Sequence, residues 1–235
     1  MPILYQDAHL IAVDKPAGLL VHRTGLDAGA TRFALQLLRD QLGAPVWPVH
    51  RLDKGTSGVL LFALDRDTAR ALGPAFETAG AIQKTYRAVV RGWPPDEGLI
   101  DHPLTRLEDD ARSPRGLARQ PARTRYRTLA RHTLPLPCGD FAQTRCALLE
   151  LVPETGRRHQ LRRHCKHMAH PIIGDATHGK GPLNRALADW LGVQRLWLHA
   201  LSLQLAHPVS GAVLRIDAPP GDEWARWAAA PHASA

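Results

Sequence analysis

The sequence has few cysteines, few lysines and no long apolar run. Its three cysteines, Cys138, Cys146 and Cys165, are too few in 235 residues for a disulfide framework. No stretch reaches the ~20 consecutive apolar residues that a membrane-spanning helix needs. The first residues have neither a basic leader nor the apolar centre of a signal peptide. We therefore expect a cytoplasmic protein with reduced thiols and no membrane association.

Several motifs of cofactor and hydrolase sites are also missing. There is no Gly-x-Gly-x-x-Gly turn between a strand and a helix and no Gly-x-x-x-x-Gly-Lys-Ser/Thr loop, so no nucleotide cofactor is expected. A Gly-x-Ser-x-Gly nucleophile turn is absent as well. Five histidines gather near Cys165, namely His159, His164, His167, His170 and His178. Without a Cys-x-x-Cys or His-Glu-x-x-His spacing they equally suit RNA contacts or packing, and we expect no metal site.

The charge balance favours a polyanionic partner. The formal net charge is +8 and the isoelectric point is near 10.0. Cations that neutralise phosphates release condensed counterions, which favours binding to nucleic acid. However, only five of the 30 basic residues are lysine, and this skew towards arginine also fits a codon-composition effect. The charge supports an RNA partner without deciding for it.

The order of apolar runs predicts an α+β protein. Strands are expected near 3–5, 10–13, 19–22, 59–64, 85–90, 196–205 and 213–216, the last two forming a hairpin. Helices are expected from Thr31 to Leu42, from Asp65 or Asp67 to Phe76, over 157–168, and around Trp224 and Trp227. Strands outnumber helices without regular alternation, which favours a largely antiparallel sheet. Residues 105–123, rich in arginine and poor in apolar residues, predict a mobile basic excursion outside the core.

The loop 50–58, His-Arg-Leu-Asp-Lys-Gly-Thr-Ser-Gly, is the first candidate for chemistry. Two glycines and two hydroxyl residues after a carboxylate suit a tight loop that presents Asp53 into a cleft. His50, Arg51 and Lys54 are expected to favour the ionised carboxylate and to attract phosphate. The alternative is that Asp53 only caps a turn, and the loop by itself leaves both open.

The run 153–164, Pro-Glu-Thr-Gly-Arg-Arg-His-Gln-Leu-Arg-Arg-His, is the second candidate. On a helix, Arg158, Leu161, Arg162 and Cys165 lie near one face. One arginine could then point inward, where it would need a carboxylate partner such as Asp53. The alternative is a solvated basic face, the commoner fate of a charge run.

Six ordered segments together resemble the pseudouridine synthases of the branch typified by the bacterial ribosomal large subunit synthase A. They cover nearly the whole chain, about residues 3–217, and each block is weak alone but specific in this order. The segments are Val-Asp-Lys-Pro-Ala-Gly-Leu-Leu-Val-His at 13–22, His-Arg-Leu-Asp at 50–53, Lys-Thr-Tyr-Arg-Ala-Val-Val-Arg-Gly at 84–92, Thr-Gly-Arg-Arg-His-Gln-Leu-Arg at 155–162, Ile-Gly-Asp at 173–175 and Leu-His-Ala at 198–200.

The resemblance implies a fold and a reaction. The fold is an α+β pseudouridine synthase domain with a mixed, mainly antiparallel sheet, flanking helices and a central cleft. The reaction isomerises uridine without a cofactor, by breaking the bond from C1′ to N1, turning the uracil and rejoining it through C5. Asp53 matches the catalytic aspartate of the family. It acts either as a nucleophile on the sugar or as the base that removes the C2′ proton, and the sequence leaves both open.

The resemblance also implies roles for four further residues. Arg162 would pair with Asp53 and keep it ionised. Tyr86 matches the aromatic residue that stacks on the extruded uracil, although a core tyrosine on a strand is the alternative. Arg51 would fill the gap left in the RNA or hold a phosphate, and Leu198 would form an apolar wall.

The segments 3–7, 21–23, 164–171, 178–179 and 194–200 resemble the family members that modify tRNA, at the uridine of position 65 in the T-stem. The chain begins in the catalytic domain, without the S4-type module of many ribosomal RNA synthases. We expect one catalytic domain over 1–220, with the insertion 105–123, a C-terminal helix and tail over 221–235, and a monomeric protein. Ribosomal RNA or several RNAs remain alternative substrates. A non-catalytic RNA-binding or chaperone protein is a different alternative, which the joint presence of Asp53, Tyr86 and Arg162 argues against. A metal-dependent RNA enzyme is the most distant alternative.

Overall fold

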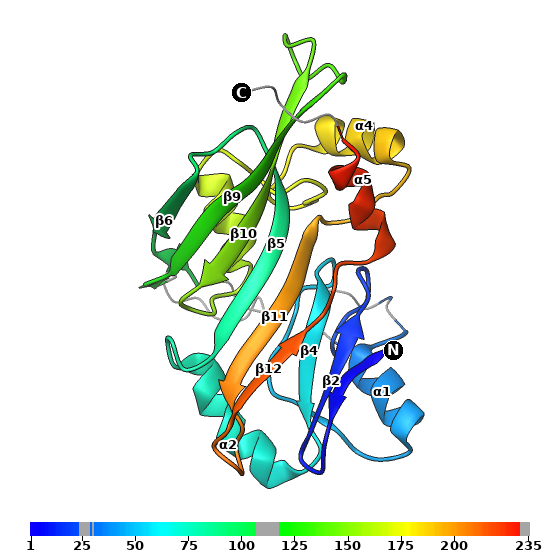
Figure 1. Ribbon diagram of the computed structural model, residues 1–235, viewed down its shortest axis with the longest axis vertical. Helices are drawn as coiled ribbons and strands as arrows, with labels where there is room; N and C mark the ends of the chain where they lie inside the picture. The colour runs from blue at the N-terminus through cyan, green and yellow to red at the C-terminus, as the bar shows by residue number, and fades with distance from the viewer. Residues whose placement is uncertain (24–28, 30, 107–117, 231–235) are drawn as a thin grey trace.

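A mixed sheet of ten strands, flanked by helices, forms the body of the protein (Figure 1). The structure is a computed structural model that describes residues 1–23, 29, 31–106 and 118–230. Along the sheet the strand order is β1-β2-β4-β11-β5-β10-β9-β6, with β12 paired to β11 and β3 paired to β4. Most pairs are antiparallel, whereas β11 runs parallel to β4. The α+β class and the mainly antiparallel sheet expected from the sequence are confirmed.

The elements have the following bounds. The strands of the large sheet are β1 (Ile3–Gln6), β2 (Leu10–Lys15), β3 (Trp47–Pro48), β4 (Ser57–Ala63), β5 (Gln83–Arg91), β6 (Glu97–Asp101), β9 (Arg123–Leu134), β10 (Thr144–Pro153), β11 (Leu198–Ala206) and β12 (Val213–Asp217). A separate two-stranded sheet joins β7 (Leu104–Thr105) and β8 (Arg119–Gln120). The helices are α1 (Ala34–Leu42), α2 (Arg66–Glu77), α3 (Gln160–His167), α4 (Gly181–Leu191), the 3-10 turn η2 (Asp222–Trp224) and α5 (Ala225–Ala228). Among the described residues, no helix is long and apolar enough to cross a membrane.

Strand β4 is apolar from Val59 to Ala63 because both of its faces are covered. All seven of its residues are buried. Leu60 and Phe62 pack into the core that holds α1, while Val59 and Leu61 pack into the core that holds α2. Successive side chains of a strand point to opposite faces, so a strand between two helical layers must be apolar at every position.

Near the middle of the sheet, β11 lies between β4 and β5 (Figure 1). His199 of β11 pairs with Ser57 of β4 in the parallel register. Its two ring nitrogens lie 2.8 Å from the Ser57 hydroxyl and 2.8 Å from the Ala218 carbonyl. Arg195 donates to the same hydroxyl from Nη2, at 2.6 Å. This buried polar network fixes β11 against β4 and against the chain that follows β12.

The C-terminal turn and helix are anchored by tryptophans, as expected from the sequence. Trp224 and Trp227 are buried and pack edge-on against Trp197, with ring centroids at 5.2 and 5.5 Å. The same core takes the apolar face of α4, which the sequence pattern did not predict. Residues 222–228 therefore pack into the core beside α4. The end of the expected C-terminal tail, 231–235, lies outside the described residues.

Two helices begin three residues later than the sequence predicts. Helix α1 begins at Ala34 instead of Thr31, because Phe33 is still extended and forms a bridge with Leu20. Helix α3 begins at Gln160 instead of residue 157, because His159 has a left-handed backbone (φ 54°). Tertiary contacts override the local signal at both starts. By contrast, the predicted start at Asp65 is confirmed, since its carboxylate accepts from the Thr68 N–H at 2.7 Å.

The flanks of the arginine-rich stretch 105–123 are ordered. Thr105 and Arg119 pair in the two-stranded sheet, and Leu104 and Ala122 are buried. Arg123 begins the long strand β9. Within 105–123, Ala122 therefore belongs to the core and Arg123 to the large sheet, whereas residues 107–117 lie outside the described residues.

Gly58 offers a test of the junction between β4 and β11. Its φ is +106°, and a Cβ there would lie 2.2 Å from the Ala200 carbonyl oxygen. We expect Gly58→Ala to lower the free energy of unfolding by more than ~2 kcal/mol, because the backbone conformation and the close approach both exclude a side chain. Gly73→Ala, in α2 with open space around it, should raise it by up to ~1 kcal/mol. Urea denaturation measures the free energy of unfolding of both variants. Equal unfolding midpoints would contradict the conclusion that the junction of β4 and β11 requires glycine at position 58.

Candidate active site

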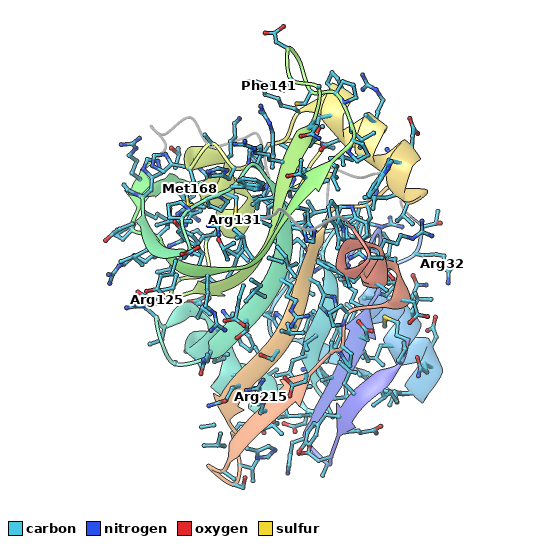
Figure 2. The ribbon with its side chains drawn as sticks, turned by 45° about the horizontal axis from the view of Figure 1, so that its top comes forward. Arg32, Arg125, Arg131, Phe141, Met168 and Arg215 are labelled. Atoms are coloured by element: carbon cyan, nitrogen blue, oxygen red, sulfur yellow. The ribbon has the colours of Figure 1, made fainter. Side chains whose placement is uncertain are left out.

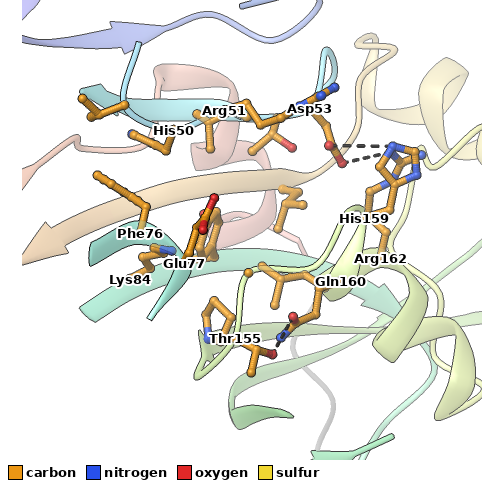
Figure 3. Close-up of a pocket in the computed structure, with 18 of the residues that line it drawn as sticks. His50, Arg51, Asp53, Phe76, Glu77, Lys84, Thr155, His159, Gln160 and Arg162 are labelled. Atoms are coloured by element: carbon orange, nitrogen blue, oxygen red, sulfur yellow. Dashed lines mark hydrogen bonds and ion pairs between the residues drawn. The ribbon is translucent and has the colours of Figure 1, made fainter. Parts of the chain in front are cut away.

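A cavity of about 340 Å³ opens between the Asp53 loop, the start of β5 and the start of α3 (Figure 3). Six of the seven residues expected at the site line it: His50, Arg51, Asp53, Tyr86, Arg162 and Leu198. The seventh, Lys54, is exposed and is not part of the lining. The structure thus brings together residues that are up to about 150 positions apart in the sequence.

Contacts of its backbone hold the Asp53 loop in place. Leu52 is buried in the core that contains α1. The Thr56 N–H donates to the Asp53 carbonyl at 3.0 Å, and the Gly18 N–H donates to the Lys54 carbonyl at 2.8 Å. Lys15, fully buried at the end of β2, also donates to the Lys54 carbonyl at 3.3 Å, and burial lowers its pKa to about 7. Lys54 therefore contributes its backbone to the site, and the charge expected from its side chain lies outside the cavity.

Arg162 lies between two carboxylates. Its Nε and Nη2 donate to the two oxygens of Asp175 at 2.7 and 2.8 Å. Its Nη1 donates to Asp53 at 3.0 Å, an interaction drawn in Figure 3. Although burial disfavours its charge, the bonds to Asp175 and Asp53 raise the pKa of Arg162. The pairing of Arg162 with Asp53 expected from the sequence is present, but the two-pronged partner of the guanidinium is Asp175.

Asp175 is a site residue to which the sequence patterns assigned no role. Its side chain is fully buried. One oxygen accepts from the backbone N–H groups of Thr177 and His178 at 2.9 and 2.8 Å, in addition to Arg162. Burial alone would raise the pKa of Asp175, but the Arg162 and backbone hydrogen bonds outweigh it and hold the pKa below its usual value. The signal that could have found it is the Ile-Gly-Asp segment at 173–175, one of the six segments of the resemblance.

His159 is a second residue at the site that was not predicted there. Its Nε2 lies 3.8 Å from Asp53, and its Nδ1 lies 3.3 Å from Nε2 of His178. Burial lowers the pKa of both histidines, although Asp53 opposes this for His159. At neutral pH the pair is uncharged, so Arg162 supplies the positive charge that Asp53 faces. The left-handed backbone of His159 is a costly conformation for a residue with a side chain, and such strain gathers at functional sites.

Tyr86 and Leu198 form the apolar side of the cavity. Leu198 is buried and pairs with Ala88, two positions along β5 from Tyr86, so both side chains lie on one face of the sheet. Tyr86 packs against the cores on both sides of the sheet junction. Burial, with a smaller effect of Asp53, raises the pKa of Tyr86. The phenol is therefore protonated at neutral pH and presents a ring beside the carboxylate.

His50 does not supply the positive charge expected of it. Its ring stacks on Phe76, with centroids at 4.6 Å, and its Nε2 accepts from the Leu61 N–H at 3.0 Å. Burial, and then the charge of Lys84, lower the pKa of His50 to about 3. The cation on this side is Lys84, whose Nζ lies over the Phe76 ring at 5.1 Å. Lys84 belongs to the segment 84–92, but the sequence alone did not single it out. Arg51 lines the cavity with an exposed side chain.

The remaining histidines of the cluster make structural contacts. His164 is buried, with ring nitrogens 2.9 Å from the Thr124 hydroxyl and 3.0 Å from the His102 carbonyl. His167 stacks on His102, and His170 lies 2.8 Å from the Arg91 carbonyl. In the described part of the chain, no three His, Cys, Asp or Glu side chains are grouped to hold a metal ion. All three cysteines are free thiols.

Comparison with known proteins decides the family. Residues 9–167 match the family model described as RNA pseudouridylate synthase. The chain belongs to the RNA pseudouridylate synthase family. A Vibrio cholerae relative, tRNA pseudouridine synthase C, is 47% identical over 95% of this chain and 93% of its own length. The resemblance drawn from the ordered segments is thereby confirmed, and the chain is an enzyme of this family.

Solved structures agree on the fold. Human RNA Pseudouridylate Synthase Domain Containing 1 aligns with 99% of this chain and 89% of its own, with a TM-score of 0.72 and 24% identity. Human RNA Pseudouridylate Synthase Domain Containing 4 aligns with 96% of this chain and 92% of its own, with a TM-score of 0.69 and 28% identity. The expected pseudouridine synthase fold is confirmed.

The buried pair of Asp175 and Arg162 predicts a pH-dependent stability. A carboxylate whose pKa is lowered by folding stabilises the protein above its unfolded pKa, about 3.9, and this contribution disappears as the pH falls through the folded pKa. We expect Asp175→Asn to lower the free energy of unfolding at pH 7 by about 3 kcal/mol. It should also flatten the decline of stability below about pH 4. Urea denaturation between pH 7 and pH 2.5 measures both effects.

Asp217→Asn is the matched control, since Asp217 pairs with Arg215 on the surface and is 51% exposed. It should unfold as the unaltered protein does at pH 7. An Asp175→Asn variant with the same pH dependence as the unaltered protein would remove Asp175 from this role.

Proposed function

We propose that the protein converts a specific uridine of a structured RNA, in the first place a tRNA, into pseudouridine. The observation that carries the proposal is the Asp53 carboxylate, which is paired with the rigidly held Arg162 in a cavity that Tyr86 and Leu198 line on the apolar side. The name of the Vibrio cholerae relative, tRNA pseudouridine synthase C, supports tRNA as the substrate. The resemblance of the segments 3–7, 21–23, 164–171, 178–179 and 194–200 supports a T-stem uridine of the position-65 type as the proposed target.

The cavity has the features that the reaction needs. A uridine inside a helix is out of reach, so the base must leave its stack and enter the cavity. Tyr86 then stacks on the uracil, and Leu198 keeps its other surroundings apolar. The C1′–N1 bond breaks, the uracil turns and C5 bonds to C1′; the C5 proton leaves and N1 gains a proton. Atoms and electrons balance within the substrate, so the proposal calls for no metal, nucleotide or redox cofactor.

Asp53 is the catalytic carboxylate of the proposal. It attacks C1′ of the ribose as a nucleophile, or it removes the C2′ proton as a base. Both routes need an ionised carboxylate with a fixed orientation. Arg162 meets this need because its own orientation is set by two bonds to Asp175. Arg51, exposed at the rim, is placed to contact the RNA around the vacated position.

The remaining parts of the proposal concern the whole chain. We propose that residues 1–220 act as one catalytic domain, with 221–235 as a C-terminal appendage. A monomer is the proposed active form. The cytoplasm, where tRNA is processed, is the proposed location.

Loss of Asp53 tests the reaction. Asp53→Asn keeps the size of the side chain but removes its charge and its basicity. We expect tritium release from C5-labelled uridine in tRNA transcripts to fall more than about 10³-fold. The affinity for RNA should stay within about twofold in a filter-binding assay, because a carboxylate contributes little to phosphate binding.

The choice of substrate is tested by comparing tRNA with ribosomal RNA fragments in the same assay. Release from ribosomal RNA alone would keep the chemistry and overturn tRNA as the substrate. An unaltered protein that binds both RNAs and releases tritium from neither would be a non-catalytic RNA-binding protein. Multiple turnovers by Asp53→Asn would remove Asp53 from its catalytic role.

The ring of Tyr86 should matter for RNA binding separately from its hydroxyl. We expect Tyr86→Leu to weaken binding of substrate RNA by about 5- to 100-fold, because a base can no longer stack on an aromatic ring. Tyr86→Phe keeps the ring and should bind within about twofold of the unaltered protein. Equilibrium binding with both variants measures this. Equal decreases of affinity in the two variants would contradict stacking as the role of Tyr86.

A further inference from the structure

A second cavity, of about 440 Å³, adjoins the Asp53 cavity. The two share Phe76, Glu77 and Gly156 as lining residues. Four arginines line the second cavity: Arg106, Arg157, Arg158 and Arg163. None of them belongs to the group that holds Asp53, so this cavity is a separate feature of the surface. We call it the arginine cavity.

The arginine cavity is built from three segments that are distant in sequence. The first is the end of α2, the second is the β7–β8 segment with Arg106 and Gln120, and the third is α3 and the turn before it, with Arg157 and Arg163. Arg163 donates from Nη1 to the Thr105 carbonyl at 2.9 Å. Arg157 donates from Nε to the Pro121 carbonyl at 3.1 Å. These bonds fix the two guanidiniums against the β7–β8 segment.

The fixed guanidiniums keep their charge and most of their donors. A guanidinium carries five N–H donors, and each of these bonds uses one of them on a neutral carbonyl. Glu77 is the one acidic residue among the described residues that line the cavity, against four arginines. Burial lowers the pKa of Arg163, because desolvation disfavours a cation, and a bound anion would offset this cost. The cavity therefore has an excess of positive charge and fixed guanidinium groups, as an anion site needs.

We propose that the arginine cavity binds the backbone phosphates next to the target uridine, and so sets which nucleotide enters the Asp53 cavity. This inference rests on the proposed function, since it takes the occupant to be the same RNA chain. Arginine recognises phosphate through paired N–H donors, and a phosphate held beside the cavity fixes the register of the chain. The two cavities share a wall. A phosphate bound in the arginine cavity therefore belongs to a nucleotide adjacent to the extruded one.

The test removes two charges of the arginine cavity. Arg157→Gln with Arg163→Gln keeps an N–H donor at each position but no positive charge. Its matched control, Arg39→Gln with Arg215→Gln, removes the same net charge from exposed residues of α1 and β12. Arg215, in β12, lies well away from Met168, which ends α3 (Figure 2). Melting of both variants by circular dichroism shows that they fold.

We expect the cavity variant to bind a substrate transcript at least about tenfold more weakly than the unaltered protein. The slope of log Kd against log salt should fall by about 0.7 to 0.9 for each phosphate that the variant no longer neutralises. In tritium release the effect should lie mainly in KM. The control variant should stay within about twofold in affinity, with an unchanged salt slope. Arg157→Lys with Arg163→Lys restores the charge and should recover most of the affinity, which also answers any effect on folding.

A substrate with a neutral methylphosphonate next to the target uridine locates the phosphate that the cavity binds. The neutral linkage should weaken the binding of RNA to the unaltered protein. It should lower the affinity of the cavity variant only a little further, because that variant already lacks the same interaction. Additive decreases of affinity would overturn the proposal, as would equal effects of the cavity and control variants. Failure of the proposed function would be distinct: the unaltered protein would then release no tritium from any RNA, whatever the cavity variant does.

Discussion

The site depends on one guanidinium shared by two carboxylates. Arg162 gives two of its N–H groups to the buried Asp175 and one to Asp53, which faces the cavity. Two carboxylates against one guanidinium leave one negative charge, and the geometry places it on the side open to the substrate. A buried ion pair is costly to break once formed, because the remaining charge stays desolvated. Asp175 therefore holds the orientation of Arg162, and Arg162 holds that of Asp53.

The sheet brings these groups together near its middle, around β11. Asp53 precedes β4, Tyr86 lies on β5, and Leu198 begins β11 between them. The polar contacts of His199 and Arg195 with Ser57 fix β11 against β4. The wall of the cavity that precedes β4 and the wall on β11 are therefore held in a fixed relative position. The motif residue next to Leu198 is thus structural, while Leu198 itself faces the cavity. The arginines of the second cavity lie outside the junction of β4 and β11, on the segments around α3 and the β7–β8 sheet.

Sequence patterns were reliable where the cause of an element is local. The start of α2 at Asp65 follows from a side-chain cap, and the apolar run 59–64 could only be a buried strand or helix segment. The starts of α1 and α3 were misplaced because a bridge to Leu20 and the left-handed His159 decide them. The charge expected of His50 was also wrong, since burial and then the charge of Lys84 lower its pKa and keep its ring neutral.

The sequence by itself determined the family, the α+β class and the residues Asp53, Tyr86 and Arg162 as members of one site. It could do so because ordered motifs and hydrophobic periodicity are properties of the chain. Only the tertiary structure decided that Asp175 anchors Arg162, that His159 lies beside Asp53, and that Lys54 lies outside the cavity. These facts depend on which groups meet after folding, on their burial and on their hydrogen bonds. Contacts such as Arg162 with Asp175 and His159 with Asp53 leave no local signal in the sequence.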